Sequence, residues 1–101
     1  SFCFVSDLVE GLIKMMVNKD CKGPVNLGNP GEYTVLELAD KIIKLTNSSS
    51  KIIFKELPSD DPVKRKPDIT LAKEKLNWEP VVEIQEGLAA TISYFRKKLN
   101  V

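Results

Sequence analysis

The residues best suited to bind a ligand lie in one charged stretch, DDPVKRKPDIT, at residues 60–70. Arg65 lies there between two prolines, each of which fixes its own φ angle and restricts the residue before it. A cation on stiff backbone loses less side-chain entropy on binding, and the planar guanidinium suits paired phosphate oxygens. The alternative is a solvated loop in which Arg65 forms surface ion pairs with Asp60 or Asp61, each worth roughly 0–1 kcal/mol. Composition alone favours the solvated loop.

The rest of the sequence excludes most other catalytic chemistry. It contains no histidine, which removes catalytic triads, histidine acid–base catalysis and the usual zinc sites. The two cysteines, Cys3 and Cys21, are not in a CxxC or metal-ligand spacing, so we expect no metal site. Fifteen basic and fourteen acidic residues leave a formal charge of +1, and no apolar run reaches about 20 residues. We therefore expect no nucleic-acid partner and no membrane contact, and any anion site must be local.

The composition is typical of one globular domain. The 101 residues are 43% hydrophobic and 29% charged, a balance that argues against disorder. A chain of this length buries a comparatively small fraction of its surface, so we expect a small core. The sequence starts on the apolar run SFCFV without an initiator methionine, and we interpret it as part of a longer protein.

Apolar residues that recur every three or four positions predict amphipathic helices. In the first of these helices, Asp7 and Glu10 have the spacing of a capping box. We interpret Asp7 as a helix cap and not as a catalytic acid, because an acidic side chain in a first turn can accept from free backbone N–H groups. Thr34 and Glu37 form a second capping box, and the helix that they open is predicted to end at residues 47–50.

Two further helices are predicted in the second half of the chain. Asp68 is placed to cap a short helix that ends near Asn77. Trp78 follows directly, and we expect it to be a packed anchor because an indole buries a large area. The last helix covers residues 84–99 and carries basic residues in its final turns, where cations suit the helix dipole.

Two short segments have the composition of strands. Residues 25–27 form one, followed by a tight loop that contains Gly28 and Gly31. Residues 51–56, KIIFKE, are β-branched and aromatic, and they form the other. The predicted fold class is therefore α/β, a helix-rich chain with two or three short strands. So few strands do not complete a sheet, and we expect them to pair with elements outside this sequence.

Five motifs, read in order, resemble a known enzyme family. Together they are similar to the C-terminal part of the UDP-glucuronate decarboxylases, which make UDP-xylose and are extended short-chain dehydrogenases/reductases. The resemblance covers essentially all of the chain in one unbroken order. The motifs are FCFVSDL, PVNLGNP, DDPVKRKPDI, AKEKLNWEP and EGL followed by YF.

The resemblance implies a two-domain enzyme in which an N-terminal Rossmann domain holds NAD. Residues 1–101 would then be the C-terminal nucleotide-sugar-binding domain. The family oxidises C4 of UDP-glucuronate with NAD, releases CO2 and returns the hydride. By the same resemblance Arg65 contacts the UDP-sugar, first at its diphosphate, with a direct catalytic part as the second alternative. Phe4 departs from the family, which usually has tyrosine there, so any hydroxyl contact is lost.

The family's glycine-rich dinucleotide loop and its tyrosine–lysine pair are absent from this sequence, so we expect the 101 residues to be inactive by themselves. The resemblance also implies a homodimer, and the absence of targeting signals suggests the cytoplasm. Two alternatives stay open. Within the same fold, the chain could belong to a UDP-glucose 4-epimerase or a nucleotide-sugar 4,6-dehydratase. From another class, it could be a protein-interaction module whose exposed apolar faces dock on a partner.

Overall fold

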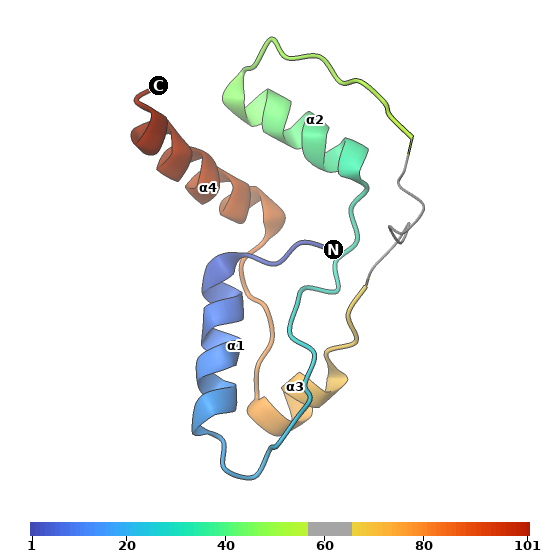
Figure 1. Ribbon diagram of the computed structural model, residues 1–101, viewed down its shortest axis with the longest axis vertical. Coiled ribbons are helices and arrows are strands. Elements are labelled where there is room, and N and C mark those ends of the chain that lie inside the picture. Colours follow the sequence, from blue (N-terminus) through green and yellow to red (C-terminus); the bar gives the residue numbers. More distant parts are fainter. Residues whose placement is uncertain (57–65) are drawn as a thin grey trace.

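Across residues 1–56 and 66–101, which are the residues described, the computed structural model forms four helices (Figure 1). The chain is flat and elongated, with extents of 51 × 36 × 18 Å. The helices form two pairs, because α1 packs against α3 and α2 packs against α4. Their bounds are Val5–Val17 for α1, Val35–Thr46 for α2, Thr70–Leu76 for α3 and Ile84–Leu99 for α4.

The core lies in the half that contains α1 and α3. Its centre is Trp78, which is 1% exposed and confirms the predicted anchor. Gly11 of α1 allows the closest approach, because a Cβ atom there would lie 3.0 Å from Leu27 and 3.1 Å from Trp78. The buried cluster consists of Ile69, Ala72, Leu76 and Trp78, with Met15, Cys21, Val25 and Leu27 packed against it.

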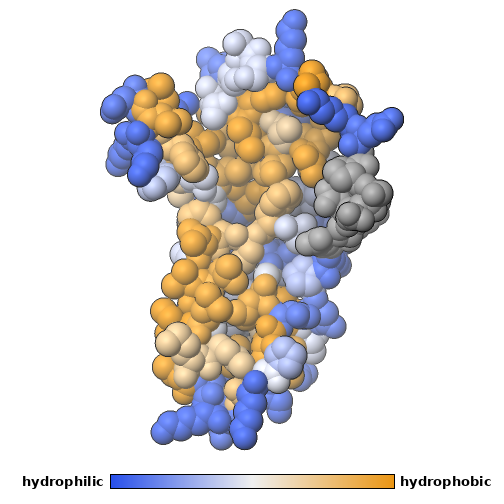
Figure 2. Space-filling view, in the orientation of Figure 1, coloured by the Kyte–Doolittle hydropathy of each residue, from blue (hydrophilic) through white to orange (hydrophobic). Residues whose placement is uncertain are grey.

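The half that contains α2 and α4 has almost no buried side chains. No residue of α2 is buried, and in α4 only Gly87 is. In the space-filling view of this face, hydrophobic side chains reach the surface over both halves (Figure 2). Within the described part of the chain, no helix is both long and apolar enough to cross a membrane.

The boundaries of the helices follow local hydrogen bonding. The Oγ1 atom of Thr34 accepts the backbone N–H of Glu37 at 3.0 Å, which confirms the predicted cap of α2. Three helices end on an asparagine in the left-handed conformation: Asn47, Asn77 and Asn100 have φ angles of 54°, 50° and 56°. The short polar side chain of asparagine tolerates this conformation. The C-cap positions at Asn47 and Asn77 confirm the predicted helix ends at residues 47–50 and near Asn77.

The prediction that Asp7 caps α1 is wrong. Phe4 occupies the N-cap position, and no side-chain hydrogen bond caps this helix. Asp7 is 2% exposed, and its carboxylate accepts the backbone N–H groups of Val81 and Val82 at 3.1 and 3.0 Å. A capping carboxylate and a buried one can share the same sequence spacing. The two cases differ in the three-dimensional position of the segment before α4, which supplies the donors to Asp7.

The predicted cap on α3 is displaced by one residue. Ile69 is at the N-cap position and has no side-chain capping bond. The Oδ1 atom of Asp68 accepts the backbone N–H of Thr70 at 3.0 Å and its hydroxyl at 2.6 Å. Asp68 lies one residue before the N-cap position, and it still accepts the free backbone N–H of the first helical residue, Thr70.

The predicted strands are not formed in the described residues, all of whose regular elements are helices. Residues 25–27 and 51–56 are irregular, and in the second segment Ile53 and Phe54 are 75% and 81% exposed. A strand requires backbone partners on a neighbouring strand, and composition alone does not supply them. The prediction of two or three short strands is therefore wrong for the described part of the chain.

Candidate functional site

Two motifs that are far apart in the sequence meet in the structure. Gly28 of the NLGNP loop is buried, and a Cβ atom placed on it would lie 2.9 Å from Cγ of Pro67. Next to this contact, Nδ2 of Asn26 donates to the backbone carbonyl of Asp68 at 3.5 Å, across 42 positions of sequence. The absence of a side chain at Gly28 therefore allows the loop to lie against the end of the charged motif.

The meeting point borders an open hollow of about 310 Å³. Its charged and hydroxyl side chains come from the start of α3 and the residues before it. Lys66 and Lys73 are exposed and, among the described residues, form no ion pair. Two ammonium groups that form no ion pair with any described residue are chemically suited to an anionic ligand. The hollow is lined by Pro30, Lys66, Pro67, Asp68, Ile69, Thr70 and Lys73.

The carboxylate of Asp68 also lines this hollow, and it accepts hydrogen bonds from a residue two positions away. The hydroxyl and the backbone N–H of Thr70 both donate to Asp68, and these bonds lower the pKa of Asp68 below its ordinary value of 3.8. Asp68 therefore stays ionised at neutral pH. Its bonds to Thr70 hold it at the start of α3.

The hollow rests directly on the core. Ile69, one of its lining residues, is 5% exposed and belongs to the same buried cluster as Ala72 and Trp78. On the other side of the contact, Leu27 also packs against this cluster. Both motifs are thus fixed to one set of packed side chains, and this gives the hollow a stable floor.

Arg65, the predicted substrate-binding residue, lies outside the described residues. Its role as a ligand of the diphosphate therefore stays a prediction. The next residue in the chain, Lys66, lines the hollow. Lys73 was not predicted from the sequence; it lies three positions after Thr70 in α3. That spacing places the two residues on one face of a helix and is the signal that could have identified it.

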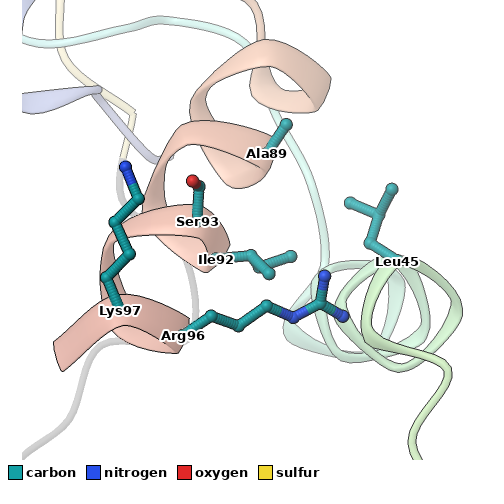
Figure 3. Close-up of a pocket in the computed structure, with 6 residues that line it drawn as sticks. All are labelled: Leu45, Ala89, Ile92, Ser93, Arg96 and Lys97. Carbon is teal, nitrogen blue, oxygen red and sulfur yellow. The ribbon is translucent and has the colours of Figure 1, made fainter. Parts of the chain in front are cut away.

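A second hollow, of about 360 Å³, lies between α2 and α4 (Figure 3). Leu45 comes from α2, and Arg96 extends from α4 toward it, whereas Lys97 points away. Arg96 and Lys97 are in the last turn of α4, where cations stabilise the helix dipole. None of the lining residues belongs to the NLGNP or DDPVKRKPDI motif. We assign these two cations a structural role.

The described residues offer no site for a metal ion, and Cys3 is not an activated thiol. They contain no group of three histidine, cysteine or acidic residues placed to hold a metal ion. Cys3 and Cys21 are free thiols of intermediate exposure. Burial, and to a lesser degree the charge of Asp7, raise the pKa of the Cys3 thiol, which keeps it protonated and weakly nucleophilic.

The chain was compared with known proteins. No protein-family model matches it. It is 54% identical over 99 residues to UDP-glucuronic acid decarboxylase 1 of Arabidopsis thaliana, a match that covers 98% of this chain and 22% of that protein. It is 52% identical over 100 residues to UDP-glucuronic acid decarboxylase 1 of Danio rerio, covering 99% of this chain and 24% of that one. The chain is a homologue of the UDP-glucuronic acid decarboxylases.

This homology confirms the resemblance drawn from the five motifs. The chain spans about a quarter of the length of these curated relatives. Solved structures also match it. A UDP-glucose 4-epimerase from Thermotoga maritima, solved with UDP-glucose, has a TM-score of 0.88 and 34% identity over 96% of this chain and 31% of that one.

A second solved structure was determined in complex with NAD+ and UDP. This enzyme, WbmF from Bordetella bronchiseptica, has a TM-score of 0.81 and 28% identity over 98% of this chain and 30% of that one. The neighbours are Rossmann-type enzymes of the epimerase and short-chain dehydrogenase/reductase family. The fold prediction is therefore supported at the level of the family, although the strands expected within this chain are not.

Proposed function

We propose that this chain is the nucleotide-sugar-binding part of a UDP-glucuronate decarboxylase, which converts UDP-glucuronate to UDP-xylose and CO2. The observation that carries the proposal is the contact between Gly28 and Pro67, which joins the two motifs most specific to the decarboxylases. Homology at about half identity over the whole chain supports the same activity. UDP or UDP-glucose in the solved neighbours supports a UDP-sugar as the ligand.

In this proposal the diphosphate binds beside the start of α3. Arg65 supplies a planar donor fork, and Lys66 and Lys73 add positive charge from the rim of the hollow. No electrostatic field of the whole chain draws the substrate in, because the formal net charge is only +1. Binding depends instead on a few local cations, so each of them should have a measurable effect.

The residues of this chain do not fit an NAD site. Its five glycines include no G-x-G-x-x-G run that could approach a dinucleotide pyrophosphate. We propose that NAD is held by another part of the full-length protein, and that the 101 residues alone have no turnover. A homodimer in the cytoplasm is likewise a proposal for that full-length protein.

The test is Arg65→Ala in the full-length protein, with Arg96→Ala as the matched control. Loss of a charge-assisted hydrogen bond should weaken UDP binding about 10- to 100-fold, measured by calorimetric titration. Arg96 lines the second hollow, which shares no residue with the first, so its variant should bind UDP like the parent. Unchanged UDP affinity with lost turnover would assign Arg65 a catalytic role. Unchanged affinity and unchanged turnover would refute both roles.

A second candidate is a UDP-glucose 4-epimerase, because solved structures related to the chain include such an enzyme at 34% identity. Product analysis of the full-length protein separates the two activities. A decarboxylase releases CO2 and a pentose nucleotide from UDP-glucuronate, whereas an epimerase interconverts two hexose nucleotides. Release of CO2 supports the first, and its absence with epimer formation supports the second.

A protein-interaction module is the candidate from another class. It is favoured by the outer face of α1, where Leu12, Ile13, Met16 and Val17 are 51%, 54%, 83% and 72% exposed. Size measurement and hydrophobic-dye binding test it on the full-length protein. A compact species without dye binding contradicts an exposed docking face, whereas a self-associated, dye-binding species supports one.

A further inference from the structure

The FCFVSDL motif contains an acidic residue whose role the proposed function does not explain. The carboxylate of Asp7 is buried, and both of its oxygens are occupied, Oδ1 by the N–H of Val81 and Oδ2 by that of Val82. In addition, the backbone carbonyl of Asp7 accepts the indole N–H of Trp78 at 2.9 Å. One residue in the first turn of α1 therefore holds three points on the segment that joins α3 to α4.

Trp78 links these hydrogen bonds to the candidate site, because it contacts both Asp7 and α3. The backbone N–H of Trp78 donates to the carbonyl of Ala72 at 3.2 Å, so the indole is tied to α3 as well as to Asp7. Trp78 packs in the same cluster as Ile69, which lines the hollow. Ile69 belongs to this cluster and directly follows Asp68 in the sequence, so the packing of the tryptophan bears directly on the start of α3.

A neighbouring contact fixes the other end of the joining segment. The ring of Phe4 lies against Gly87 in the first turn of α4, where a Cβ atom would be 2.9 Å from Cδ1 of the ring. Phe4 and Asp7 together hold both the segment 78–82 and the helix that follows it. The ring packing at Phe4 serves this purpose without the hydroxyl that a tyrosine would add.

We infer that Asp7 is a positioning residue of the proposed decarboxylase: its buried carboxylate fixes residues 78–82, and through Trp78 it sets the start of α3 against the Gly28 loop. A carboxylate suits this place because it only accepts hydrogen bonds, and two backbone N–H groups need two acceptors. The expected effect on substrate binding rests on the proposed function. The positioning of residues 78–82 and of α3 by Asp7 can be tested without measuring enzyme activity.

Hydrogen exchange in the full-length protein tests the structural step. Asp7→Asn keeps the side-chain volume but turns an N–H₂ group toward an N–H donor. We expect exchange of the Val81 and Val82 amides to rise about tenfold, and that of Thr70 and Lys73 in α3 to rise with them. Asp40→Asn, the same change at an exposed carboxylate of α2, is the control and should alter none of these amides.

Two results of that measurement would overturn the inference. If exchange rises at Val81 and Val82 but Thr70 and Lys73 stay protected, Asp7 holds the joining segment without setting α3. If none of the four amides responds, the carboxylate does not hold even that segment. Should Asp7→Asn fail to fold, an ester linkage in place of the Val82 amide deletes one donor and keeps every side chain. The remaining amides, those of Val81, Thr70 and Lys73, then decide.

Steady-state kinetics test the consequence for the substrate. A residue that positions the binding surface should raise the KM for UDP-glucuronate about tenfold and leave kcat near the parent value in Asp7→Asn. A fall in kcat at unchanged KM overturns the positioning role. Failure of the proposed function is a different result, because the parent protein would then neither bind UDP nor release CO2, while the amide exchange would still report on Asp7.

Discussion

The two halves of the molecule use similar sequence patterns and reach different degrees of burial. α1 and α3 surround a tryptophan that is 1% exposed, whereas α2 has no buried residue at all. Yet the apolar residues of α2 recur at helical spacing just as those of α1 do: they are Val35, Leu38, Ala39, Ile42 and Leu45. An amphipathic pattern creates an apolar face, but burial also requires a surface that fits it.

Polar contacts between distant residues account for part of the difference. Lys14 Nζ donates to the carbonyl of Asn77 at 2.9 Å, and Asn18 Nδ2 donates to that of Lys75 at 2.9 Å. These bonds occupy the free carbonyls at the end of α3 and tie them to α1. Among the described residues, no hydrogen bond joins α2 to α4 in this way. The contrast between a cross-linked half and an open half can be tested by substitution.

The largest effect is expected for Trp78→Ala. Removing this buried indole should lower the free energy of unfolding by about 3–5 kcal/mol, because a cavity forms at the centre of the only buried cluster in the described residues. The matched change in the open half is Phe95→Ala, whose ring is 52% exposed and should cost less than about 1 kcal/mol. Denaturant unfolding followed by circular dichroism measures both. Equal losses would remove the distinction between the halves.

Gly28→Ala should have the next largest effect. Its new Cβ atom would lie 2.9 Å from the rigid ring of Pro67, so the two motifs must separate. We expect a loss of about 1–3 kcal/mol in stability together with weaker UDP binding by the full-length protein. In the control, Gly31→Ala, the nearest atom is the movable side-chain oxygen of Asn29 at 3.1 Å. If Gly28→Ala bound UDP like the parent, the contact would have no part in the site.

Thr34→Ala should have a smaller effect, confined to the open half. It removes the oxygen that caps α2 and should cost about 1 kcal/mol of helix stability, seen as faster amide exchange in the first turn of α2. Thr34→Ser keeps the oxygen and should behave like the parent. Because α2 contacts neither α1 nor α3, amides beside Trp78 should be unaffected. Faster exchange there would show that the halves unfold together.

The smallest effect concerns pH and the start of α3. Since hydrogen bonds from Thr70 lower the pKa of Asp68, this group's stabilising contribution is fully present above its ordinary pKa of 3.8. That contribution is lost as the pH falls through the lower pKa of the folded state. Thr70→Val removes the hydroxyl donor, so the pKa of Asp68 should move back toward 3.8 in an NMR titration of its carboxyl carbon. An unchanged pKa would contradict the stated cause.

Local interactions could be predicted from the sequence because all of their partners lie within a few residues. The cap at Thr34 and the helix end at Asn77 are of this kind, and the structure confirms both. In both cases the residue type determines the outcome, since a hydroxyl and a short amide satisfy a local need directly. The burial of Trp78 was predicted from the size of its side chain alone and is confirmed, although its partners are distant in the sequence.

Interactions with distant partners could not be predicted in the same way. The carboxylate of Asp7 is satisfied by N–H groups 74 and 75 positions away, and its spacing to Glu10 gave no sign of them. The contact of Gly28 with Pro67 likewise became visible only in three dimensions. Arg65 was identified from its motif alone, and its position lies outside the described residues.

The exposed segment at residues 51–56 has a practical consequence for work with this chain. Ile53 and Phe54 are largely exposed on backbone that, in the described residues, has no neighbouring strand. A short β-prone, apolar stretch with open backbone groups is a template for pairing between molecules, and so a site of aggregation at high concentration. Lys51 and Lys55 border its apolar core and oppose such pairing by charge repulsion. Purification at low salt preserves that repulsion, because less of it is screened.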